Sequence, residues 1–404
     1  MATLRRELGL RETVVYGVGL ILGAGIYAIL GEAAGLTGES VVVSFLLAAL
    51  VASLTGLSYA ELASMYPKGE GDYVYVRAAF GPAPAAFTAL CRLLVGAVSA
   101  AAVALAFSGY LAGVFAVPAV PVAVGLVALL TLVNYLGIDL SVRVNVLFTA
   151  LEVLGLLIVV VIGVGSWGQV DPTATTNGAF GVVEAIFLVF FAYLGFGSIV
   201  NVAEETRDPE RTIPRAVVLA IVVTTVLYVA VALSAVALVD PAALGASGSP
   251  LADVALVGWG PLGAQVVGAI ALFSTTNTVL ILLVSTSRLF YGVSKTEYRA
   301  FPSVFSRVHP TRRTPHYAVF AVGALTVPFV LLGDVGRVAG VANLLLLVVF
   351  FLVNAAQLRL RYTAPDAERG FRVPLDVGRL SLPALGGLLS SVLLVAFYLN
   401  TLVS

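Results

Sequence analysis

The sequence predicts an all-α protein that crosses a membrane many times, organised as two five-helix halves of opposite orientation. The first observation is composition: 60% of the 404 residues are hydrophobic and 11% are charged, whereas a soluble domain has about 25% charged residues. The second is a series of apolar runs long enough to span a bilayer. The third is a pair of glycine-rich interruptions, about 170 residues apart, within two of these runs. We therefore expect one integral membrane domain over residues 1–404.

Charged or Pro/Gly-rich breaks separate the apolar runs, which is the pattern of successive membrane-spanning helices. The first run follows Arg11 and Glu12 and is too long for the apolar part of a signal peptide, so we expect it to remain as the first span. About eleven spans are predicted, near residues 13–34, 40–65, 83–115, 119–136, 143–167, 180–202, 213–239, 260–291, 316–332, 337–358 and 381–402.

Lysine and arginine are distributed unevenly between the two sets of loops. The alternate loops near 35–39, 113–119, 168–179 and 240–259 contain neither residue, while the other loops are rich in arginine. Arg337 lies at the boundary of the side whose loops lack lysine and arginine, and Arg92 lies within a span. Because cytoplasmic loops carry the excess of basic residues, we expect a multi-pass protein of the cell membrane with a cytoplasmic N-terminus.

The first span contains a cluster of glycines, at positions 17, 19, 23 and 25, between Tyr16 and Tyr27. Glycine destabilises a helix by about 1 kcal/mol per residue relative to alanine. One explanation is close packing between helices, for which Gly19 and Gly23 have the appropriate spacing. The other is a helix that breaks inside the membrane and turns free backbone groups toward a cavity.

The sixth span has a similar defect, since Gly195 and Gly197 interrupt the apolar stretch Phe190–Ser198. Five spans begin with the first defect and five with the sixth, so the two halves face opposite ways across the membrane. Interrupted helices at corresponding positions are the sequence mark of inverted repeats. We expect the repeats to cover about residues 11–167 and 179–360, with an extra C-terminal helix at about 381–402.

Two broken helices around one cavity have a defined chemistry. A half-helix N-terminus offers N–H groups to an anion, and a half-helix C-terminus offers carbonyls to a cation. The ligand that complements both is a zwitterion such as an α-amino acid, and neither break carries a charged side chain. The amides would come from Gly23, Ala24 and Gly25. The carbonyls would come from Ile21, Phe191 and Leu194.

The remaining candidate residues flank these positions. Tyr193 and Phe196 would close over a substrate, or would simply pack as aromatic residues in spans usually do. The predicted binding set also contains Ile26, Ala192 and Gly195.

Four stretches resemble the APC (amino acid–polyamine–organocation) superfamily of transporters, which have a LeuT-like fold. They are Gly19–Tyr27; Ser58–Ala63 with Pro67–Tyr73; Phe190–Phe196 with Ala203–Pro214; and Ser287–Tyr291. The resemblance implies a five-plus-five core, alternating access and secondary transport of amino acids or related amines. It places the carboxylate contacts on Gly23, Ala24 and Gly25, and the amino contacts on Ile21, Phe191 and Leu194.

The chain departs from that family at two charged positions. Many relatives carry an acidic residue where this chain has Gly197, which weakens the case for a cationic substrate. Some proton-coupled relatives place a lysine nine residues after an arginine on the fifth helix, whereas nine residues after Arg143 this chain has Glu152.

Glu152 lies in the middle of a span, where a carboxyl group is costly and is by default a functional candidate. It would carry a coupling proton, or it would bind Na⁺ together with hydroxyls such as those of Ser274 and Thr275. The alternatives are a neutral hydrogen-bonded carboxyl group that holds helices together, and an error in the span boundary. Of the other ionisable residues, Glu61 is expected in an ion pair, and Arg92 either extends toward the cytoplasm or pairs with a carboxylate. Asparagines within spans, such as Asn277, Asn343 and Asn354, are expected to form hydrogen bonds between helices.

Other function classes lack their signals in this sequence. A net charge of zero indicates no nucleic-acid partner. One cysteine, Cys91, and two histidines in one loop indicate no metal site and no cofactor beyond a coupling H⁺ or Na⁺. An enzyme would need a nucleophile–base pair, and none is recognisable. The expected partners are a small-molecule substrate, an amino acid, and membrane lipid. The rival hypothesis is a non-transporting amino-acid sensor or accessory subunit on the same fold. The substrate side chain, the coupling mode and the oligomeric state stay open.

Overall fold

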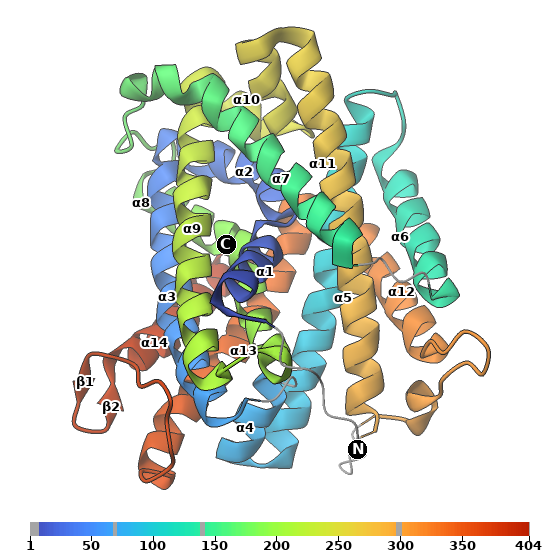
Figure 1. The fold of residues 1–404 in the computed structure, drawn as a ribbon. Helices are drawn as coiled ribbons and strands as arrows, with labels where there is room; N and C mark the ends of the chain where they lie inside the picture. The colour runs from blue at the N-terminus through green and yellow to red at the C-terminus, as the bar shows by residue number, and fades with distance from the viewer. Residues whose placement is uncertain (1–7, 68–70, 138–141, 296–300, 404) are drawn as a thin grey trace.

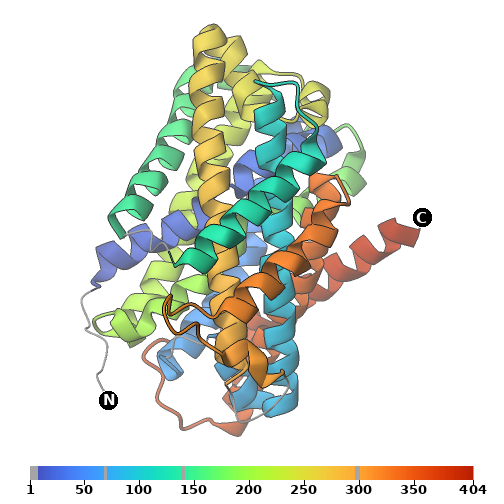
Figure 2. The same ribbon diagram turned by 90° about the vertical axis from the view of Figure 1, so that its right-hand side faces the viewer.

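The computed structural model describes residues 8–67, 71–137, 142–295 and 301–403, and this part of the chain is almost entirely helical. The helices run up and down a single bundle (Figure 1). Turning the molecule shows that α14 diverges from the bundle toward its C-terminal end (Figure 2). Within the described residues the strands are the short antiparallel pair β1 (Asp376–Val377) and β2 (Leu380–Ser381).

The helices occur in the following order along the chain. The first part contains α1 (Leu10–Leu22), α2 (Gly25–Thr37), η1 (Gly38–Ser40), α3 (Val41–Met65), α4 (Asp72–Phe80), α5 (Pro82–Ala112), α6 (Ala119–Leu136), α7 (Val142–Gly163) and η2 (Val164–Gln169). The second part contains α8 (Gly178–Val189), η3 (Phe190–Glu205), α9 (Pro209–Leu238), α10 (Pro241–Ala246), α11 (Pro250–Val293), η4 (Ser303–Ser306), α12 (His316–Val330), α13 (Val335–Thr363) and α14 (Leu382–Val403).

Every predicted apolar run coincides with a helix or with two consecutive helices. By length and apolarity, nine helices among the described residues can cross a membrane, and α12 is a shorter apolar helix. One of the nine is the continuous run Gly25–Met65. The multi-pass prediction is therefore confirmed, while the count of eleven spans stays a prediction. The eighth run begins earlier than expected because α11 continues through a kink at Gly260, whose φ is 77°.

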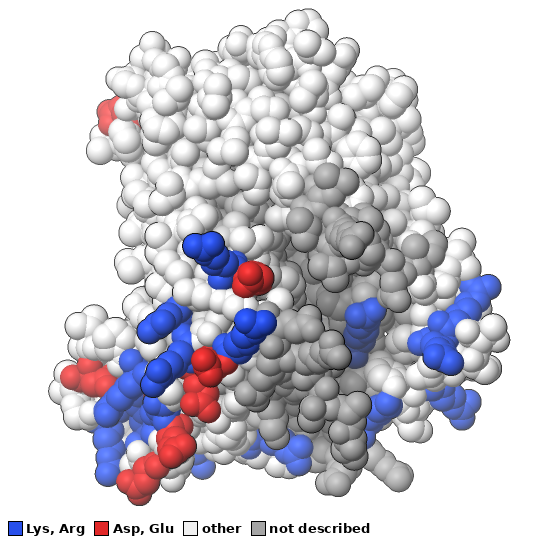
Figure 3. Space-filling model, in the orientation of Figure 1, with Lys and Arg blue, Asp and Glu red and all other residues white. Residues whose placement is uncertain are grey.

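Charged side chains gather at one end of the molecule. On the face shown in Figure 3, Lys, Arg, Asp and Glu cluster around the end that carries α4 and the β1–β2 hairpin, and the opposite end shows one small acidic patch. The upper half of this face shows almost no Lys, Arg, Asp or Glu, which fits a bilayer-embedded body with one strongly charged aqueous end.

Buried polar side chains join helices that are distant in sequence. Asn354 of α13 accepts a hydrogen bond from Ser58 Oγ (2.7 Å) and donates one to Thr55 Oγ1 (3.0 Å), both on α3. Asn343 donates to the Phe187 carbonyl at 2.7 Å. Such bonds between asparagine and its neighbours are a common means of helix association in membranes. Asn354 and Asn343 thus act as the sequence pattern predicts.

Arg92 of α5 pairs with Asp72 of α4 at 2.7 Å, so of the two possibilities left open by the sequence the carboxylate partner is the one found. Arg92 also donates a hydrogen bond to Ser198 of η3 at 3.3 Å. This ion pair connects three elements near the charged end of the bundle.

Glu61 forms the most buried ion pair at the charged end, as expected for an ion-pair partner. Arg361 donates to it through Nε (2.9 Å) and Nη2, and the Val373 N–H donates to Glu61 Oε2 at 2.9 Å. Arg361 in turn pairs with Asp376 of β1. The segment 364–381, between α13 and α14, is thereby fastened to α3 across about 300 residues of sequence.

We expect Glu61→Gln to lower the free energy of unfolding by about 3 kcal/mol, because it leaves Arg361 buried without its main countercharge. The control is Arg372→Gln, which removes the 2.9 Å pair between Asp376 and a side chain that is 58% exposed. An exposed pair contributes under about 1 kcal/mol. Equilibrium unfolding in detergent measures both variants. Equal losses would contradict a special role for the buried pair.

Candidate functional site

The first predicted span is broken where the glycine cluster lies. α1 ends at Leu22, α2 begins at Gly25, and residues 23–24 connect the two. The first bond inside α2 runs from the Ala28 N–H to the Ala24 carbonyl (3.0 Å). The amides of the first turn of α2 therefore point into the break without an intrahelical acceptor, at the positive end of the helix dipole.

A side chain from another helix provides a hydrogen-bond acceptor for one of the backbone amides at the break. Thr278 of α11 accepts a hydrogen bond through Oγ1 from the Ala24 N–H at 3.1 Å. A Cβ added at Gly23 would lie 3.2 Å from the same oxygen, so the glycine is what allows Thr278 to approach. Thr278 was not predicted as a site residue, and its position in an ordinary apolar helix gives no signal of this contact.

The second predicted defect differs from the expected unwound segment. The chain stays helical, but it changes from an α-helix to a 3₁₀-helix at Phe190 and keeps that form to Glu205. Runs of 3₁₀-helix longer than three or four residues are uncommon, and inside a helix they often mark a functional hinge. The interruption therefore begins at Phe190, not at Gly195 and Gly197.

The two defects pack directly against each other. A Cβ at Gly195 would collide with the Leu20 carbonyl oxygen, and a Cβ at Gly25 would lie 2.9 Å from the Ala192 Cα. Both glycines thus let α1, α2 and η3 approach at backbone distance. Both explanations of the glycine cluster therefore apply. The helix is broken at residues 23–24, and glycines at the defects also allow neighbouring helices to pack closely.

Tyr228 of α9 bridges the two defects. Its hydroxyl oxygen lies 2.7 Å from the Ile21 carbonyl and 3.1 Å from the Ala192 carbonyl, and it is the donor to both. Sequence reasoning did not find this residue, since a tyrosine inside a long apolar run is ordinary. The bridge fixes the C-terminal end of α1 beside the start of η3.

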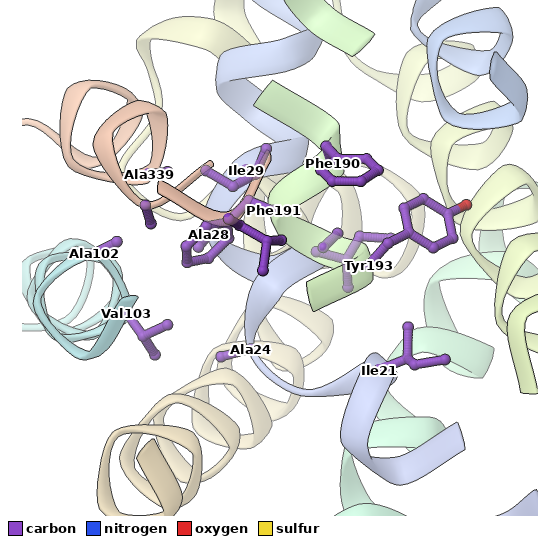
Figure 4. Close-up of a cluster of buried hydrophobic side chains, with 14 of the residues drawn as sticks. Ile21, Ala24, Ala28, Ile29, Ala102, Val103, Phe190, Phe191, Tyr193 and Ala339 are labelled. Carbon is purple, nitrogen blue, oxygen red and sulfur yellow. The ribbon is translucent and has the colours of Figure 1, made fainter. Parts of the chain in front are cut away.

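A cluster of buried apolar side chains lies beside the break. In Figure 4, Ala24 lies on the connection between the two half-helices, and labelled side chains from η3, α2, α5 and α13 lie to one side of it. They are Phe190, Phe191, Ala28, Ile29, Ala102, Val103 and Ala339, all of them buried.

The predicted binding residues divide into two groups by exposure. Four of them are partly exposed, namely Gly23, Gly25, Leu194 and Gly195. The others are buried, namely Ile21, Ala24, Ile26, Phe191, Ala192, Tyr193 and Phe196.

The two candidate closing aromatics are packed in this structure. Phe196 lies against Tyr59 and Phe350, with ring centroids 5.8 and 5.1 Å away. Tyr193 is edge-on to Tyr228 at 5.4 Å and donates its hydroxyl hydrogen to the Phe45 carbonyl at 3.3 Å. Both contacts match the packing interpretation of these side chains.

Glu152 of α7 is buried beside Ser274 and Asn277 of α11. Among the described residues, Glu152 Oε1, Ser274 Oγ and Asn277 Oδ1 have no hydrogen-bond partner. Thr275 is turned away, because its hydroxyl donates to the Ala271 carbonyl of its own helix at 2.7 Å. Of the predicted coupling residues the structure therefore brings Glu152 and Ser274 together, and it adds Asn277, which the sequence had suggested only as a hydrogen bonder between helices.

Glu152 is linked to the break by two short routes. The Tyr27 hydroxyl, from the first turn of α2, donates to the Glu152 backbone carbonyl at 3.0 Å. Ser274 lies one helical turn before Thr278, whose hydroxyl oxygen accepts the hydrogen bond from the Ala24 N–H. The Glu152 cluster therefore lies close to the N-terminus of α2.

Comparison with known proteins gives one family and a consistent set of relatives. The family model described as amino acid permease matches residues 8–403. An uncharacterised transporter of Mycobacterium tuberculosis is 34% identical over 88% of this chain and 81% of its own length. From Bacillus subtilis, the branched-chain amino acid permease BcaP is 29% identical (92% and 84% covered), and a methylthioribose transporter is 27% identical (92% and 85% covered).

We expect Gly195→Ala to reduce the yield of folded protein severely, because the added methyl group meets the rigid Leu20 backbone. The control is Gly268→Ala in α11, where the nearest atom to the new Cβ is the Ala252 Cβ at 3.9 Å. That change favours the helix by about 1 kcal/mol. Size-exclusion chromatography and thermal unfolding compare the two. Normal folding of Gly195→Ala would show that α1 and η3 are not in close contact.

Proposed function

Because the chain belongs to the amino acid permease family, we propose that it transports zwitterionic amino acids across the cell membrane by alternating access. It is a multi-pass membrane transporter by its family and by its apolar helices. In the proposed arrangement two inverted repeats, about residues 11–167 and 179–360, enclose the substrate, and the N-terminus is cytoplasmic. The concentration of arginine at one end of the bundle supports that orientation.

The break at residues 23–24 is the observation that carries the proposal. Amides at the start of α2 suit a carboxylate. Carbonyls of Ile21, Phe191 and Leu194 suit an ammonium group. The Tyr228 hydroxyl contacts both the Ile21 and the Ala192 carbonyl and so keeps the end of α1 next to η3. Residues 19–27 and 190–198, which form the two defects, include no charged side chain. A ligand whose own charges balance is therefore matched better than an ion.

Glu152 is proposed as the coupling residue. A buried carboxyl group between helices either holds a proton or needs a cation when it is ionised. The three oxygens of Glu152, Ser274 and Asn277 that lack partners offer ligands for Na⁺, and Glu152 alone would serve a proton. Both ions are retained as candidates. The contacts of Tyr27 and Thr278 supply the mechanical connection to the substrate.

Uptake by purified protein in liposomes tests this function. The panel contains leucine, alanine, arginine, glutamate and methylthioribose, each with a proton gradient, a sodium gradient or neither. We expect uptake of neutral amino acids driven by one gradient, and a loss on the order of tenfold in Glu152→Gln, because the buried carboxyl group is the proposed coupling group. Glu368→Gln, at an exposed position of the charged end, is the control.

The outcomes of this assay separate the hypotheses. Gradient-independent uptake that survives Glu152→Gln would reduce Glu152 to helix packing and indicate an exchanger or facilitator. Transport of methylthioribose alone would overturn the amino-acid assignment. Folded protein that moves none of these compounds would favour the sensor or accessory subunit.

A second prediction concerns Tyr228. We expect Tyr228→Phe to raise KM about fivefold, because the single hydroxyl hydrogen that the Ile21 and Ala192 carbonyls share contributes about 1 kcal/mol to holding these carbonyls in place. Tyr398→Phe, whose ring stacks on Phe187 with centroids 4.1 Å apart, is the matched control. Initial uptake rates measure both. An unchanged KM in Tyr228→Phe would remove Tyr228 from the site.

A further inference from the structure

The β1–β2 hairpin stands out from the charged end of the bundle (Figure 1). Val377 pairs with Leu380, so residues 378–379 form the turn, and Gly378 has the positive φ of 64° that such a turn favours. The Leu382 N–H closes the base by donating to the Leu375 carbonyl at 3.2 Å. Leu375 itself has a φ of 66°, which is strained for a branched residue.

Two large apolar side chains of this hairpin are highly exposed. Leu375 is 73% exposed and Val377 is 64% exposed. Comparable values occur at Val161 and Val226, which lie on apolar helices of spanning length, where lipid covers such residues. Outside a span, exposed apolar side chains that stand close together mark an interaction surface.

The charges of the hairpin are arranged unevenly. Its one carboxylate, Asp376, is turned toward the bundle and pairs with Arg361 and Arg372. Arg379, in the turn, is exposed. The exposed part of the hairpin therefore combines the apolar side chains of Leu375 and Val377 with the guanidinium group of Arg379, a composition that suits an interface with anionic headgroups.

The position of the hairpin, directly before a helix able to cross the membrane, indicates that its partner is the lipid bilayer. α14 starts at Leu382, directly after β2, and is one of the helices able to cross the membrane. Residues 375–381 must accordingly lie at the boundary between membrane and water.

We propose that the hairpin rests on the inner leaflet, with Leu375 and Val377 among the headgroups and Arg379 against anionic phospholipid. The assignment to the inner leaflet rests on the orientation given in the proposed function, whereas contact with the bilayer does not.

The same hairpin is connected to the interior. The Arg361 guanidinium group forms ion pairs with both Asp376 of β1 and Glu61 of α3. The hairpin is therefore connected to the buried carboxylate of α3 through one side chain. Lipid contact at the hairpin thus bears on how α3 and α13 are held together at the cytoplasmic face.

The test places an environment-sensitive fluorophore on Val377→Cys in a Cys91→Ala background, since Cys91 is the only native cysteine. Nanodiscs that hold one protein each are made with phosphatidylcholine alone or with added phosphatidylglycerol. We expect blue-shifted emission and quenching by a lipid-phase quencher. Phosphatidylglycerol should raise the bound population about fivefold, and Arg379→Gln should abolish that increment, because one arginine near an anionic surface accounts for it.

The control site is Thr311→Cys, exposed at the same end and followed by Arg312 and Arg313 but remote from the hairpin in sequence. Emission from position 377 that matches this control, with quenching from water only, would overturn the proposal. So would a blue shift that appears only when two copies share a nanodisc, which would identify a second chain as the partner. Neither readout depends on transport, so a failure here leaves the proposed function standing.

Discussion

The constraint behind this structure is that a backbone polar group inside a membrane needs a partner from the protein itself. A helix that opens at residues 23–24 loses the bonds that normally satisfy it. The surrounding elements replace some of them: Thr278 takes the Ala24 N–H, and Tyr228 reaches the Ile21 carbonyl. The amides that are still free at the start of α2 are consequently the ones available to a ligand.

Tyrosine hydroxyl groups supply several of the hydrogen bonds to backbone carbonyls around the break. Tyr228 donates to the Ile21 carbonyl at 2.7 Å, Tyr110 donates to the Tyr27 carbonyl at 3.2 Å, and Tyr27 donates to the Glu152 carbonyl of α7 at 3.0 Å. A phenol combines a large apolar body with a single polar tip, so it satisfies a carbonyl without bringing water into the core. The two half-helices of the break are therefore connected to α9, α5 and α7.

The sequence predicted the parts of the fold that depend on local composition. Apolar runs located the helices, and the glycine cluster located the first break, because a run of glycines in a span is costly without a reason. The second defect was placed at Gly195 and Gly197, whereas the 3₁₀ segment starts at Phe190, where the sequence carries no glycine to signal it. Tyr228, Thr278 and Asn277 were missed or undervalued because only the folded arrangement brings them to the break or to Glu152.

The ion pair of Glu61 imposes an order on the making of this protein. Glu61 is synthesised 300 residues before Arg361 and still longer before Asp376. While α3 is already in the membrane, its carboxylate has no countercharge from the C-terminal part of the chain. It lies near the end of α3, where water can solvate it in the meantime. The last steps of biogenesis must then dehydrate this site as residues 361–376 arrive, so closure of the charged end of the bundle is a late event that reports on the synthesis of this segment.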